Sequence, residues 1–501
     1  MAMEQEFYIE GTTIEYKKAK DEFPKSFWET YSSFSNTEGG IIYLGVSENK
    51  QGREVTGVKD ASQYIQTIVD TANDNKFTNF NNIDNNNIEV LEKDGLTYIK
   101  VYIPEVKSEN KPLHVKNNIN NSYIRRNDSD HRMSGEEIRR YLRDANPKSD
   151  SELLSNFNID DLDLDAVRKY KNLIHERNSE MDVLSMDNWE FLKQFGAVGK
   201  DRIENEFKLK KGALLFFGKE KAILDVFPNF HLDYRNRTHY SEDERWIDRV
   251  ASGELGTEEV NLFNFYNTVL NKLVNTVLDG FALDKTTQVR QDVKTDVEVS
   301  LREALANLLI HADYEDNSSI IVEAYKNNYV FTNPGELLVT KEEFARGGES
   351  NPRNSTIVTL FRKAGYSERA GSGGMKIFRA AHKNKFRMPE IDSSEGKTKL
   401  KIWKIDLVDS YENLVEQEKT ILQFIVKENR KVKMKEIQTL EGFTEYIAKT
   451  NVNSLIEKGI VKRFGESRST TYGLKPNSSE MIANIEHNMR NMQESIINKN
   501  R

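Results

Sequence analysis

The chain has 501 residues and a formal net charge of −8; it is too long for one core, and its length indicates about three or four domains. The absence of cysteine excludes disulfides, thiolate zinc sites and a cysteine nucleophile. The N-terminus lacks an apolar signal segment, and no apolar run approaches the roughly 20 residues of a membrane span, so we expect a cytoplasmic protein without a membrane partner. Nucleic acid stays open as a partner, because its binding depends on local basic patches.

The first region, residues 1–148, alternates short apolar segments with amphipathic ones, which is typical of an α/β domain. The Lys93–Gly95 turn predicts a hairpin, and Ser134 with Glu137 forms a capping box that opens a basic helix. An Asn-rich segment at 70–87 predicts a loop. The expected strands span 12–18, 41–46, two stretches of 88–103, and 123–126, and the expected helices span 24–35 and 135–143.

The sequence after residue 148 divides into further segments. With the first region, they predict a multidomain protein of the α/β and α+β classes. Residues 149–290 are mixed and carry no chemical motif, so we expect a linking and dimerisation region there. It includes predicted helices near 165–176 and 258–278 and a predicted buried strand at Gly212–Phe217. The remaining segments are an α/β unit at 291–408, three helices with a strand pair at 409–476, and a helical tail at 477–501.

Three carboxylates of the first region are candidates for a metal site. Glu10 and Glu15 flank the start of the first expected strand, and Glu48 follows the strand that ends at Val46. Together with the neighbouring Lys17, they suit one or two divalent metals, Mg²⁺ or Mn²⁺, which orient water for an in-line attack on phosphate. Spacing alone favours the alternative of ordinary surface charges, because the chain holds 80 acidic residues.

Three short motifs surround these carboxylates: EGTTIEYK from Glu10, NTEGG from Asn36 and GVSE from Gly45. Together they resemble the Schlafen AlbA-like domain, whose pattern is an E-x-x-x-x-E-F-K strand, an A-N-T-x-G-G turn and a G-V-D-D turn. In nucleolytic members, three acidic residues of this pattern form the RNA-cleaving site. The resemblance therefore implies catalytic and metal-binding roles for the three carboxylates, with Lys17 beside them. The chain departs from the pattern in the third motif, where Ser and Glu replace two aspartates.

Basic residues of the first region interleave with Tyr123 and with asparagines, as expected of a surface that follows a nucleic-acid backbone. The alternative is a solvated helix face. Arg125 and Arg126 carry most weight, because the corresponding strand of the Schlafen-like family also bears arginine. The candidates for nucleic-acid contact in this region are Lys111, Lys116, Arg125, Arg126 and Arg132.

A polar stripe marks one face of the helix expected near the start of the 291–408 unit. Glu303, Asn307 and His311 are spaced at i, i+4 and i+8, so they project from the same side. This pattern suits a magnesium–nucleotide site in which Asn307 holds the metal, Glu303 polarises water and His311 meets phosphate. The alternative is the polar side of an ordinary amphipathic helix.

Later segments of the same unit add residues that suit a nucleotide: FTNPGEL from Phe331, NPRN from Asn351 and ERAGSGGM from Glu368, whose glycines let backbone amides face an anion. With the polar stripe, they resemble the GHKL (Bergerat-fold) ATP-binding domain, in the bacterial subfamily that often follows Schlafen AlbA-like domains. Asn333 stands where catalytic members use an adenine-reading Asp, so ATP binding without hydrolysis stays open. The implied nucleotide-binding residues are Glu303, Asn307, His311, Asn333, Gly335, Gly371, Gly373 and Gly374.

The C-terminal segment has expected helices at 416–428, 434–440 and 444–458, followed by expected strands at 460–464 and 470–474. This order resembles a winged helix-turn-helix. One interpretation places the third helix in a DNA major groove, with phosphate contacts from the wing. The other is a winged helix that contacts protein. The candidate DNA-contacting residues are Lys449, Asn451, Lys462, Arg463 and Arg468.

Three functions follow from these expectations and stay open. The first is a metal-dependent nuclease for RNA such as tRNA, or for DNA, controlled by an ATP-binding domain and suited to phage defence or stress response. The second is an ATP-binding, DNA-binding transcriptional regulator without nuclease activity, and the third is a scaffold with a relic nucleotide site. Because Schlafen-like domains often work in pairs and this chain has one, we expect a homodimer or a larger homo-oligomer.

Overall fold

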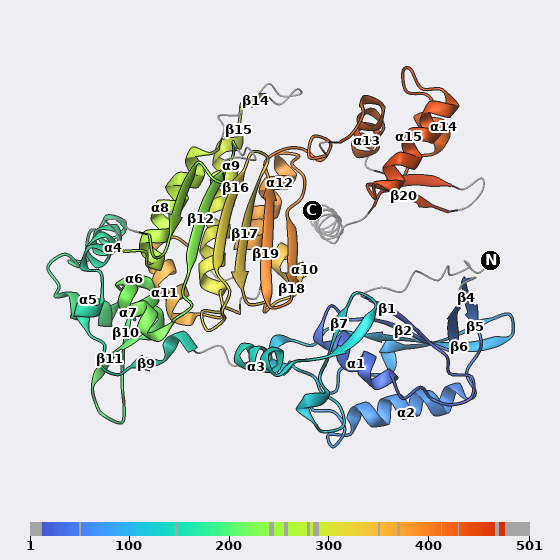
Figure 1. Ribbon diagram of the computed structural model, residues 1–501, viewed down its shortest axis with the longest axis horizontal. Helices are drawn as coiled ribbons and strands as arrows, with labels where there is room; N and C mark the ends of the chain where they lie inside the picture. The colour runs from blue at the N-terminus through green and yellow to red at the C-terminus, as the bar shows by residue number, and fades with distance from the viewer. Residues whose placement is uncertain are drawn as a thin grey trace, which may run out of the picture. The chain divides into compact units, whose positions relative to one another are not determined.

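The computed structural model divides the chain into two compact units, Met1–Ser149 and Asp150–Arg501 (Figure 1). None of the helices in the described residues combines the length and the apolar character that crossing a bilayer requires. The structure describes residues 13–49, 52–145, 149–239, 245–254, 259–277, 281–283, 290–348, 351–367, 371–411, 413–428, 430–465 and 470–475.

A four-stranded sheet in the order β1-β2-β6-β5 forms the centre of the first unit. Its first two strands pair in parallel, and the other pairs are antiparallel. Helices α1 (Phe27–Asn36) and α2 (Ala61–Asn73) contribute aromatic and aliphatic side chains to the main core of this unit. The strands are β1 (Ile14–Lys17), β2 (Gly40–Leu44), β5 (Ile88–Lys93) and β6 (Leu96–Ile103).

Alternation along β1 gives this sheet two different faces. On one face, Tyr16 stacks on Tyr43 in a small separate cluster, with ring centroids 5.3 Å apart. On the other face, Ile42 belongs to the main core with α1, and its register partner on β1 is Glu15. Glu15 and Lys17 therefore lie on the helix-covered face, opposite Tyr16.

Two hairpins and a third helix complete the first unit. The predicted hairpin turn is confirmed: Asp94 and Gly95 have φ values of 52° and 75°, as such a tight turn requires. The capping box is also confirmed, since Ser134 and Glu137 bond each other's backbone N–H. The segment 70–87 is less irregular than predicted, because it begins inside α2 and ends in a short 3₁₀ turn. The added elements are β3 (Val46–Asn49), β4 (Gly52–Val55), β7 (Tyr123–Arg126), β8 (Ser129–Arg132) and α3 (Gly135–Asp144).

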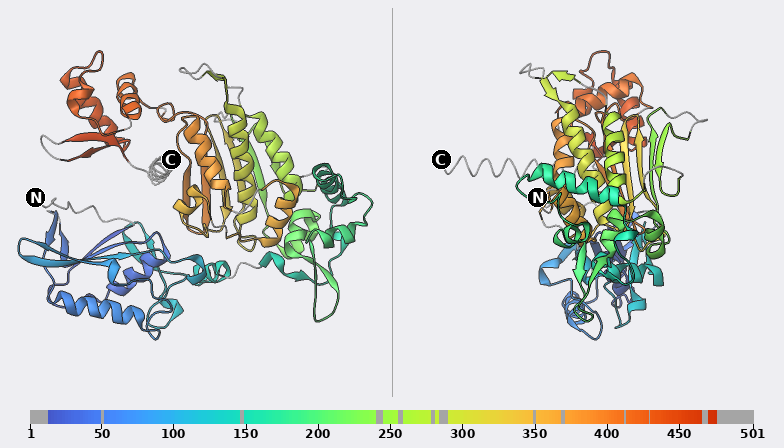
Figure 2. Two further views of the ribbon diagram at one scale, coloured as in Figure 1. Left: turned by 180° about the vertical axis from the view of Figure 1, so that it is seen from behind. Right: turned by 90° about the vertical axis from the view of Figure 1, so that its left-hand side faces the viewer.

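A six-stranded sheet in the order β13-β12-β16-β17-β19-β18 forms the centre of the second unit. The β12–β16 pair is parallel, and the other pairs are antiparallel. Three long helices cover one face of the sheet (Figure 2). The elements are β12 (Leu232–Arg237), β13 (Asp248–Ala251), α8 (Leu262–Asn275), α9 (Val293–His311), β16 (Ile320–Tyr325), β17 (Asn328–Pro334), α12 (Gly373–Lys383), β18 (Glu390–Ser394) and β19 (Lys397–Trp403).

This sheet runs across the boundary expected between 149–290 and 291–408. β12 and β13 come from the first of these regions, yet they extend the strands of the second. One core cluster likewise joins Tyr234 of β12 to Leu305 of α9 and Phe331 of β17. In the described residues the two regions therefore share one sheet and one core.

The predicted strand at Gly212–Phe217 is wrong, because these residues form most of helix α6 (Lys211–Phe217). Every residue from Gly212 to Phe217 is buried, and Phe216 packs against Tyr170 and Phe361 with ring centroids 5.8 and 5.3 Å apart. A segment buried on all sides has no periodicity that separates a helix from a strand. The remaining elements of this unit up to α11 are β9 (Leu153–Leu154), α4 (Leu164–Arg177), α5 (Asn188–Gln194), β10 (Val198–Lys200), β11 (Phe207–Lys210), α7 (Glu220–Val226), β14 (Phe281–Leu283), β15 (Arg290–Asp292), α10 (Lys341–Arg346) and α11 (Ser355–Ala364).

The last described elements are three helices and a two-stranded sheet, in the predicted order. The buried carboxylate of Glu418 joins the first helix to the third, since it accepts hydrogen bonds from Ser454 at 2.6 Å and from Lys458 at 2.7 Å. The predicted wing residue Arg468 and the predicted tail at 477–501 lie outside the described residues. The elements are α13 (Glu416–Glu428), α14 (Met434–Ile437), α15 (Glu445–Glu457), β20 (Val461–Phe464) and β21 (Thr471–Leu474).

Candidate functional site

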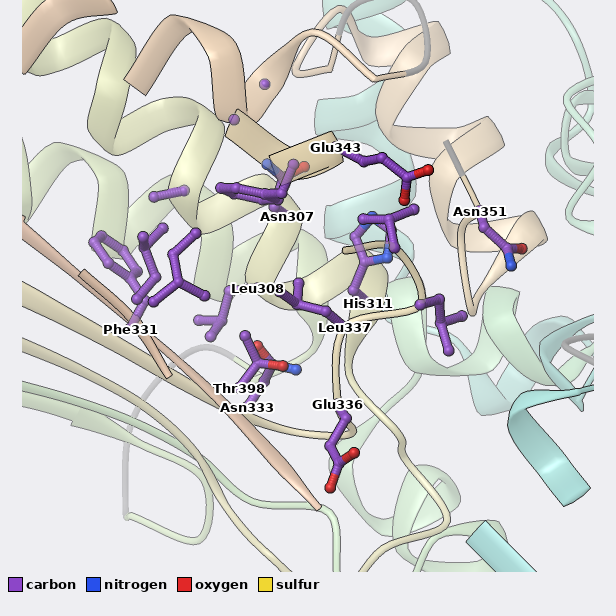
Figure 3. A pocket seen from close by; sticks show the side chains of 18 of the residues that line it. Asn307, Leu308, His311, Phe331, Asn333, Glu336, Leu337, Glu343, Asn351 and Thr398 are labelled. Carbon is purple, nitrogen blue, oxygen red and sulfur yellow. The ribbon is translucent and has the colours of Figure 1, made fainter. Parts of the chain in front are cut away.

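Helix α9 carries the predicted polar stripe of Glu303, Asn307 and His311. Asn307 and His311 line a pocket between α9, the sheet and the start of α12 (Figure 3). Glu303 lies one turn before Asn307, is 2% exposed, and is not one of the lining residues. Its carboxylate is paired with Lys376 of α12, whose Nζ lies 2.8 Å from Glu303 Oε1. The structure thus brings two residues of the stripe to the pocket and buries the third beside it.

The pocket has an apolar wall on the sheet side with polar groups around it. Its volume is about 870 Å³, including the part that is open to solvent. Figure 3 shows Asn333 and Thr398 across the pocket from Asn307 and His311. Apolar walls with a few convergent polar groups are typical of small-molecule sites. The lining residues from the sheet are Phe331, Asn333, Ile391, Thr398 and Leu400.

The end of β17 shapes the pocket on the sheet side. Asn333 is buried there, and its Nδ2 donates a hydrogen bond to the Pro334 carbonyl at 2.9 Å. Gly335 follows with φ of 93°, and a Cβ at this position would lie 2.5 Å from the Arg353 guanidinium, so the turn requires glycine. Thr398 donates to the Gly335 carbonyl at 2.8 Å. Of the two residues predicted here, Asn333 lines the pocket, and Gly335 only forms the turn beneath it.

The glycines before α12 bring backbone to the opposite side of the pocket. Gly371, Gly373 and Gly374 all line it. A Cβ on Gly373 would stand 2.7 Å from Asn307 Nδ2 and 3.0 Å from Glu303 Oε2, so a larger residue here would have to displace these two α9 side chains. The first amides of a helix lack partners within it, and a helix start favours an anion. This side of the pocket is therefore suited to phosphate.

The segment 351–354 fixes the end of α9, a role that the sequence did not reveal. Asn354 Nδ2 donates to the carbonyls on both sides of His311, at 2.9 and 2.7 Å. Arg353 donates to the carbonyl of His311 itself and, at 2.9 Å, to that of Glu336. These bonds satisfy carbonyls that a helix end leaves open. They hold His311 and Glu336 in place at the pocket. The NPRN motif marks this segment in the sequence, but the motif does not indicate which backbone carbonyls its side chains bind.

The surroundings of His311 keep its imidazole neutral near pH 7. Burial, together with the nearby positive charge of Arg353, lowers the pKa of His311 from 6.5 to about 4. A neutral imidazole can donate or accept a hydrogen bond, but it brings no positive charge to a phosphate. The predicted contact of His311 with phosphate is therefore limited to a hydrogen bond.

We expect one of the eight histidines to titrate near pH 4 in an NMR titration of the labelled chain. Its resonance is assigned by its loss in His311→Gln, and Arg353→Gln is expected to move the midpoint upward because it removes a nearby positive charge. Since the folded pKa lies below the unfolded one, His311 stabilises the fold above about pH 6.5, and this contribution is lost between about pH 6.5 and 4. A midpoint near 6.5 contradicts this description.

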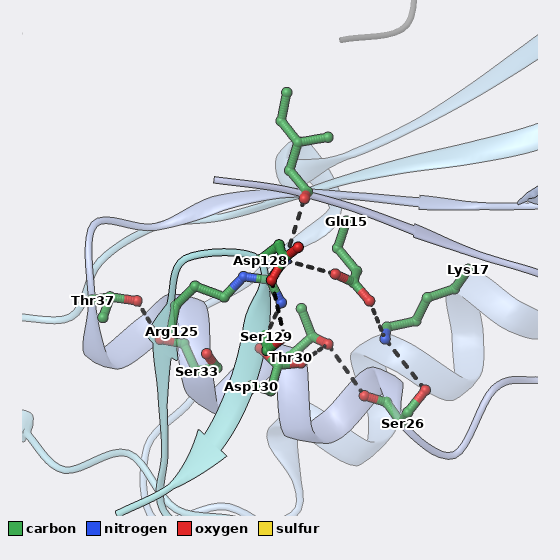
Figure 4. Close-up of polar contacts among 11 residues, drawn as sticks. Glu15, Lys17, Ser26, Thr30, Ser33, Thr37, Arg125, Asp128, Ser129 and Asp130 are labelled. Carbon is green, nitrogen blue, oxygen red and sulfur yellow. Dashed lines mark hydrogen bonds and ion pairs between the residues drawn. The ribbon is translucent and has the colours of Figure 1, made fainter. Parts of the chain in front are cut away.

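In the first unit, Glu15 belongs to a buried network of charges (Figure 4). Its two carboxylate oxygens contact Lys17 Nζ at 3.0 Å and Arg125 Nη2 at 2.7 Å. Arg125 also contacts Asp130 at 2.9 Å, and Asp130 accepts a hydrogen bond from Thr30 at 2.5 Å. The network pairs two basic with two acidic groups, and buried charges paired in this way are costly to separate.

The structure does not bring Glu15 and Glu48 together. Glu48 pairs with Arg53 across the β3–β4 hairpin, and the Arg53 guanidinium lies over the Tyr16 ring, 5.1 Å from its centroid. Tyr16 points to the face of β1 opposite Glu15. Glu10 lies outside the described residues. Within the part of the chain that is described, no three His, Asp or Glu side chains are placed to hold a metal ion. The predicted three-carboxylate site is therefore not assembled from its described members.

Two predicted nucleic-acid contacts of the first unit do not offer their charge to solvent. The Arg125 side chain is 1% exposed and is bound to Glu15 and Asp130. Lys111 is largely buried and pairs with Glu105 at 2.7 Å. The sequence shows that these residues are basic, but it does not show that they face acidic partners inside the fold. The predicted nucleic-acid contacts of Arg125 and Lys111 are therefore wrong. The exposed candidates in this unit are Lys116, Arg126 and Arg132.

Among the C-terminal candidates, the predicted outward role of Asn451 also needs correction. Its Nδ2 donates to the Ile447 carbonyl of the same helix at 2.9 Å, so the amide is turned toward its own backbone. Tyr446, which the sequence did not single out, is 78% exposed on the first turn of α15. The exposed basic candidates here are Lys449, Lys462 and Arg463.

Three stretches of the chain match known sequence families. Residues 10–134 match the family described as "Schlafen, AlbA_2", and residues 317–402 match "Putative ATP-dependent DNA helicase recG C-terminal". Residues 139–233 match a domain of unknown function. The chain therefore carries a Schlafen AlbA_2 domain and a RecG-like C-terminal domain. No curated protein matches the chain.

Solved structures that are similar to this chain include the following two. The DIP2311 protein from Corynebacterium diphtheriae is 14% identical, with 92% of this chain and 95% of that chain covered and a TM-score of 0.38. The N-terminal domain of a "Putative ATP-dependent DNA Helicase RecG-related Protein" from Nitrosomonas europaea is 26% identical, with 21% of this chain and 71% of that chain covered and a TM-score of 0.19.

Proposed function

We propose that this chain is an ATP-binding protein that acts on nucleic acid. In this proposal a GHKL-like domain at 291–408 binds the nucleotide and regulates the Schlafen AlbA-like domain at 1–148. The segment 409–476 is proposed as a winged helix-turn-helix that reads DNA or contacts protein. The segment 149–290, whose strands β12 and β13 belong to the sheet of the 291–408 domain, is proposed to link it to the first unit and to provide the dimerisation surface of a homodimer or larger homo-oligomer.

The pocket beside α9 carries this proposal, because its two sides differ in chemistry. The apolar surface of Phe331 and Leu400 suits the flat base of a nucleotide, and the buried amide of Asn333 at the same side can read the edge of that base. The glycines at 371–374 put the start of α12 at the other side, where backbone amides suit phosphates. The family match at 317–402 supports the same assignment.

Asn307 is the proposed protein ligand for the Mg²⁺ or Mn²⁺ that accompanies the nucleotide. Its amide is close to the backbone of Gly373, at the helix start where the phosphates are proposed to bind. Mg²⁺ usually takes one or two protein ligands and fills its shell with phosphate oxygens and water. One amide oxygen therefore fits a metal that the nucleotide itself largely holds.

Calorimetric titration of the full chain with ATP and Mg²⁺ tests the proposal. We expect one ATP to bind per chain, and we expect omission of the metal to weaken the binding, because the metal neutralises phosphate charge. The proposal is abandoned if neither ATP nor another nucleoside triphosphate binds.

A metal-dependent nuclease, suited to phage defence or stress response, is the second candidate function. The contact between Glu15 and Lys17 favours it, because a carboxylate and an amine lie 3.0 Å apart on β1, inside the stretch that matches the Schlafen family. Cleavage in this proposal requires that Glu15 exchange at least one of its basic partners for a metal. Without cleavage, the same chain is an ATP-binding regulator that only binds nucleic acid.

Incubation with tRNA and with single- and double-stranded DNA, in Mg²⁺ or Mn²⁺ and with or without ATP, separates these candidates. If the chain is a nuclease, Glu15→Gln is expected to slow cleavage by about 100-fold or more, as loss of a residue at the reacting centre does. Glu89→Gln, which removes an exposed carboxylate paired with Lys100, serves as the control and should cut like the wild type. Absence of cleavage, or equal cleavage by Glu15→Gln, rules the nuclease out.

A further inference from the structure

The Glu303–Lys376 ion pair lies where the two helices of the pocket meet. Glu303 Oε1 is 2.8 Å from Lys376 Nζ, and Arg302 Nη2 is 3.8 Å from the same oxygen. The carboxylate is almost fully buried, whereas the Lys376 side chain is 22% exposed. An unpaired carboxylate in such a place is costly, so the lysine compensates its charge.

The other oxygen of this carboxylate faces the phosphate side of the pocket. Glu303 Oε2 lies 3.0 Å from the point where a Cβ on Gly373 would stand, and Asn307 Nδ2 lies 2.7 Å from the same point. Gly373 and Asn307 both line the pocket. Lys376 follows Gly373 within the first turns of α12. The ammonium group of Lys376 is therefore held by a carboxylate directly behind the backbone that is proposed to receive phosphate.

From this geometry we infer that Lys376 binds the phosphates of the nucleotide. We infer also that Glu303 holds the Lys376 side chain when no nucleotide is bound. This inference rests on the proposed ATP site and specifies how that site selects phosphorylated ligands. A lysine ammonium sits on a flexible four-carbon chain with three donors, so it can change partners without movement of α12. Glu303 competes with the ligand for the lysine and repels phosphate by its own charge. The two residues therefore act in opposite directions on ATP binding, and neither contributes to binding of the base.

A purely structural ion pair makes a different prediction. If the pair only fastens α12 to α9, its loss should lower the thermal stability and weaken every ligand of the pocket alike. The chain offers a matched control for this alternative, because Lys383 Nζ also lies 2.8 Å from an acidic group of α9, Asp296 Oδ2. This second pair joins the same two helices, but Lys383 is the last residue of α12, at the end of the helix opposite Gly373.

Calorimetric titrations with ATP and with adenosine, both in Mg²⁺, test the inference on the full chain. Lys376→Met is expected to weaken ATP binding about 10- to 100-fold, the range for lost hydrogen bonds to charged groups, and to leave adenosine binding unchanged. Glu303→Gln is expected to tighten ATP binding, because it removes a negative charge and loosens the lysine. Such a gain cannot come from damage to the fold. Lys383→Met is expected to change neither affinity.

The outcomes separate this inference from the proposed function. If the wild type binds ATP but Lys376→Met keeps the ATP-to-adenosine affinity ratio, Lys376 is not a phosphate ligand and the inference fails alone. The inference is also overturned if Lys383→Met lowers the ATP-to-adenosine affinity ratio as much as Lys376→Met does. Weaker ATP binding by Glu303→Gln overturns it too. If the wild type binds no nucleotide, both the proposed function and this inference are wrong.

Discussion

Gly373→Val is expected to abolish ATP binding. Even the Cβ of a larger residue would stand 2.7 Å from Asn307 Nδ2 and 3.0 Å from Glu303 Oε2, and valine adds two methyl groups beyond it. These groups must displace the two α9 side chains or fill the phosphate side of the pocket. The measurement is calorimetric titration with ATP and Mg²⁺, and we expect a loss of more than about 100-fold, the scale of several lost charged hydrogen bonds.

Gly135→Val is a matched control for this prediction. Gly135 and Gly373 are each the first residue of a helix, but a Cβ on Gly135 would meet only the end of the Arg139 side chain, at 3.7 Å. This variant should bind ATP like the wild type. Thermal unfolding of both variants shows whether the second unit still folds. A folded Gly373→Val variant with normal affinity would mean that ATP binds elsewhere.

Reversal of charge at Arg126 and Arg132 is expected to weaken binding of RNA by the first unit. Both side chains are exposed on the β7–β8 hairpin, unlike that of Arg125, the residue before Arg126, which is buried. Each lost phosphate contact removes the release of one counterion. The double variant Arg126→Glu/Arg132→Glu should therefore bind about tenfold or more weakly and show a smaller salt dependence, with the log–log slope reduced by about 1.4 for single strands.

The control reverses two charges on β6 and β5, the strands that lie farthest from β1 in the four-stranded sheet. Lys93 and Lys100 lie on β5 and β6, whereas Arg125 of β7 contacts β1 at the opposite edge. Fluorescence anisotropy with a labelled RNA, at several salt concentrations, measures both double variants. Equal losses would mean that only the total charge matters. An unchanged slope in Arg126→Glu/Arg132→Glu would place the nucleic-acid surface elsewhere, with Lys462 and Arg463 as the next residues to reverse.

Elements that depend on local chemistry could be predicted from the sequence. The helix α13 has the predicted bounds Glu416–Glu428, and the Ser134 capping box opens α3 as expected, because periodicity and caps act within a few residues. The segment Gly212–Phe217 was predicted wrongly for the converse reason. Its residues are buried on every side, so their sequence shows no polar face from which the helix could be recognised.

The same difference between local patterns and long-range packing applies to the candidate sites. The stripe of Asn307 and His311 could be predicted, because residues four apart on a helix share a face. The buried role of Arg125 could not, since its partner Glu15 is 110 residues away in the chain. Lys376 was missed for the same reason, because Glu303 is 73 residues away. Partners at such separations are set by the packing of whole elements, and a single sequence does not show that packing.

The parallel pairing of β12 with β16 decides which fragments of this chain are worth expressing. The RecG-like match begins at residue 317, but a fragment that starts at 291 loses Leu232–Arg237, the strand that covers one side of β16. The backbone N–H and C=O groups on that side of β16 are then unpaired and can bind the same strand of another copy. Such a fragment is therefore prone to aggregate. A fragment that starts at Asp150 keeps this strand. It also keeps the Asp150 carboxylate, which accepts from the Thr356 amide at 2.8 Å and caps α11.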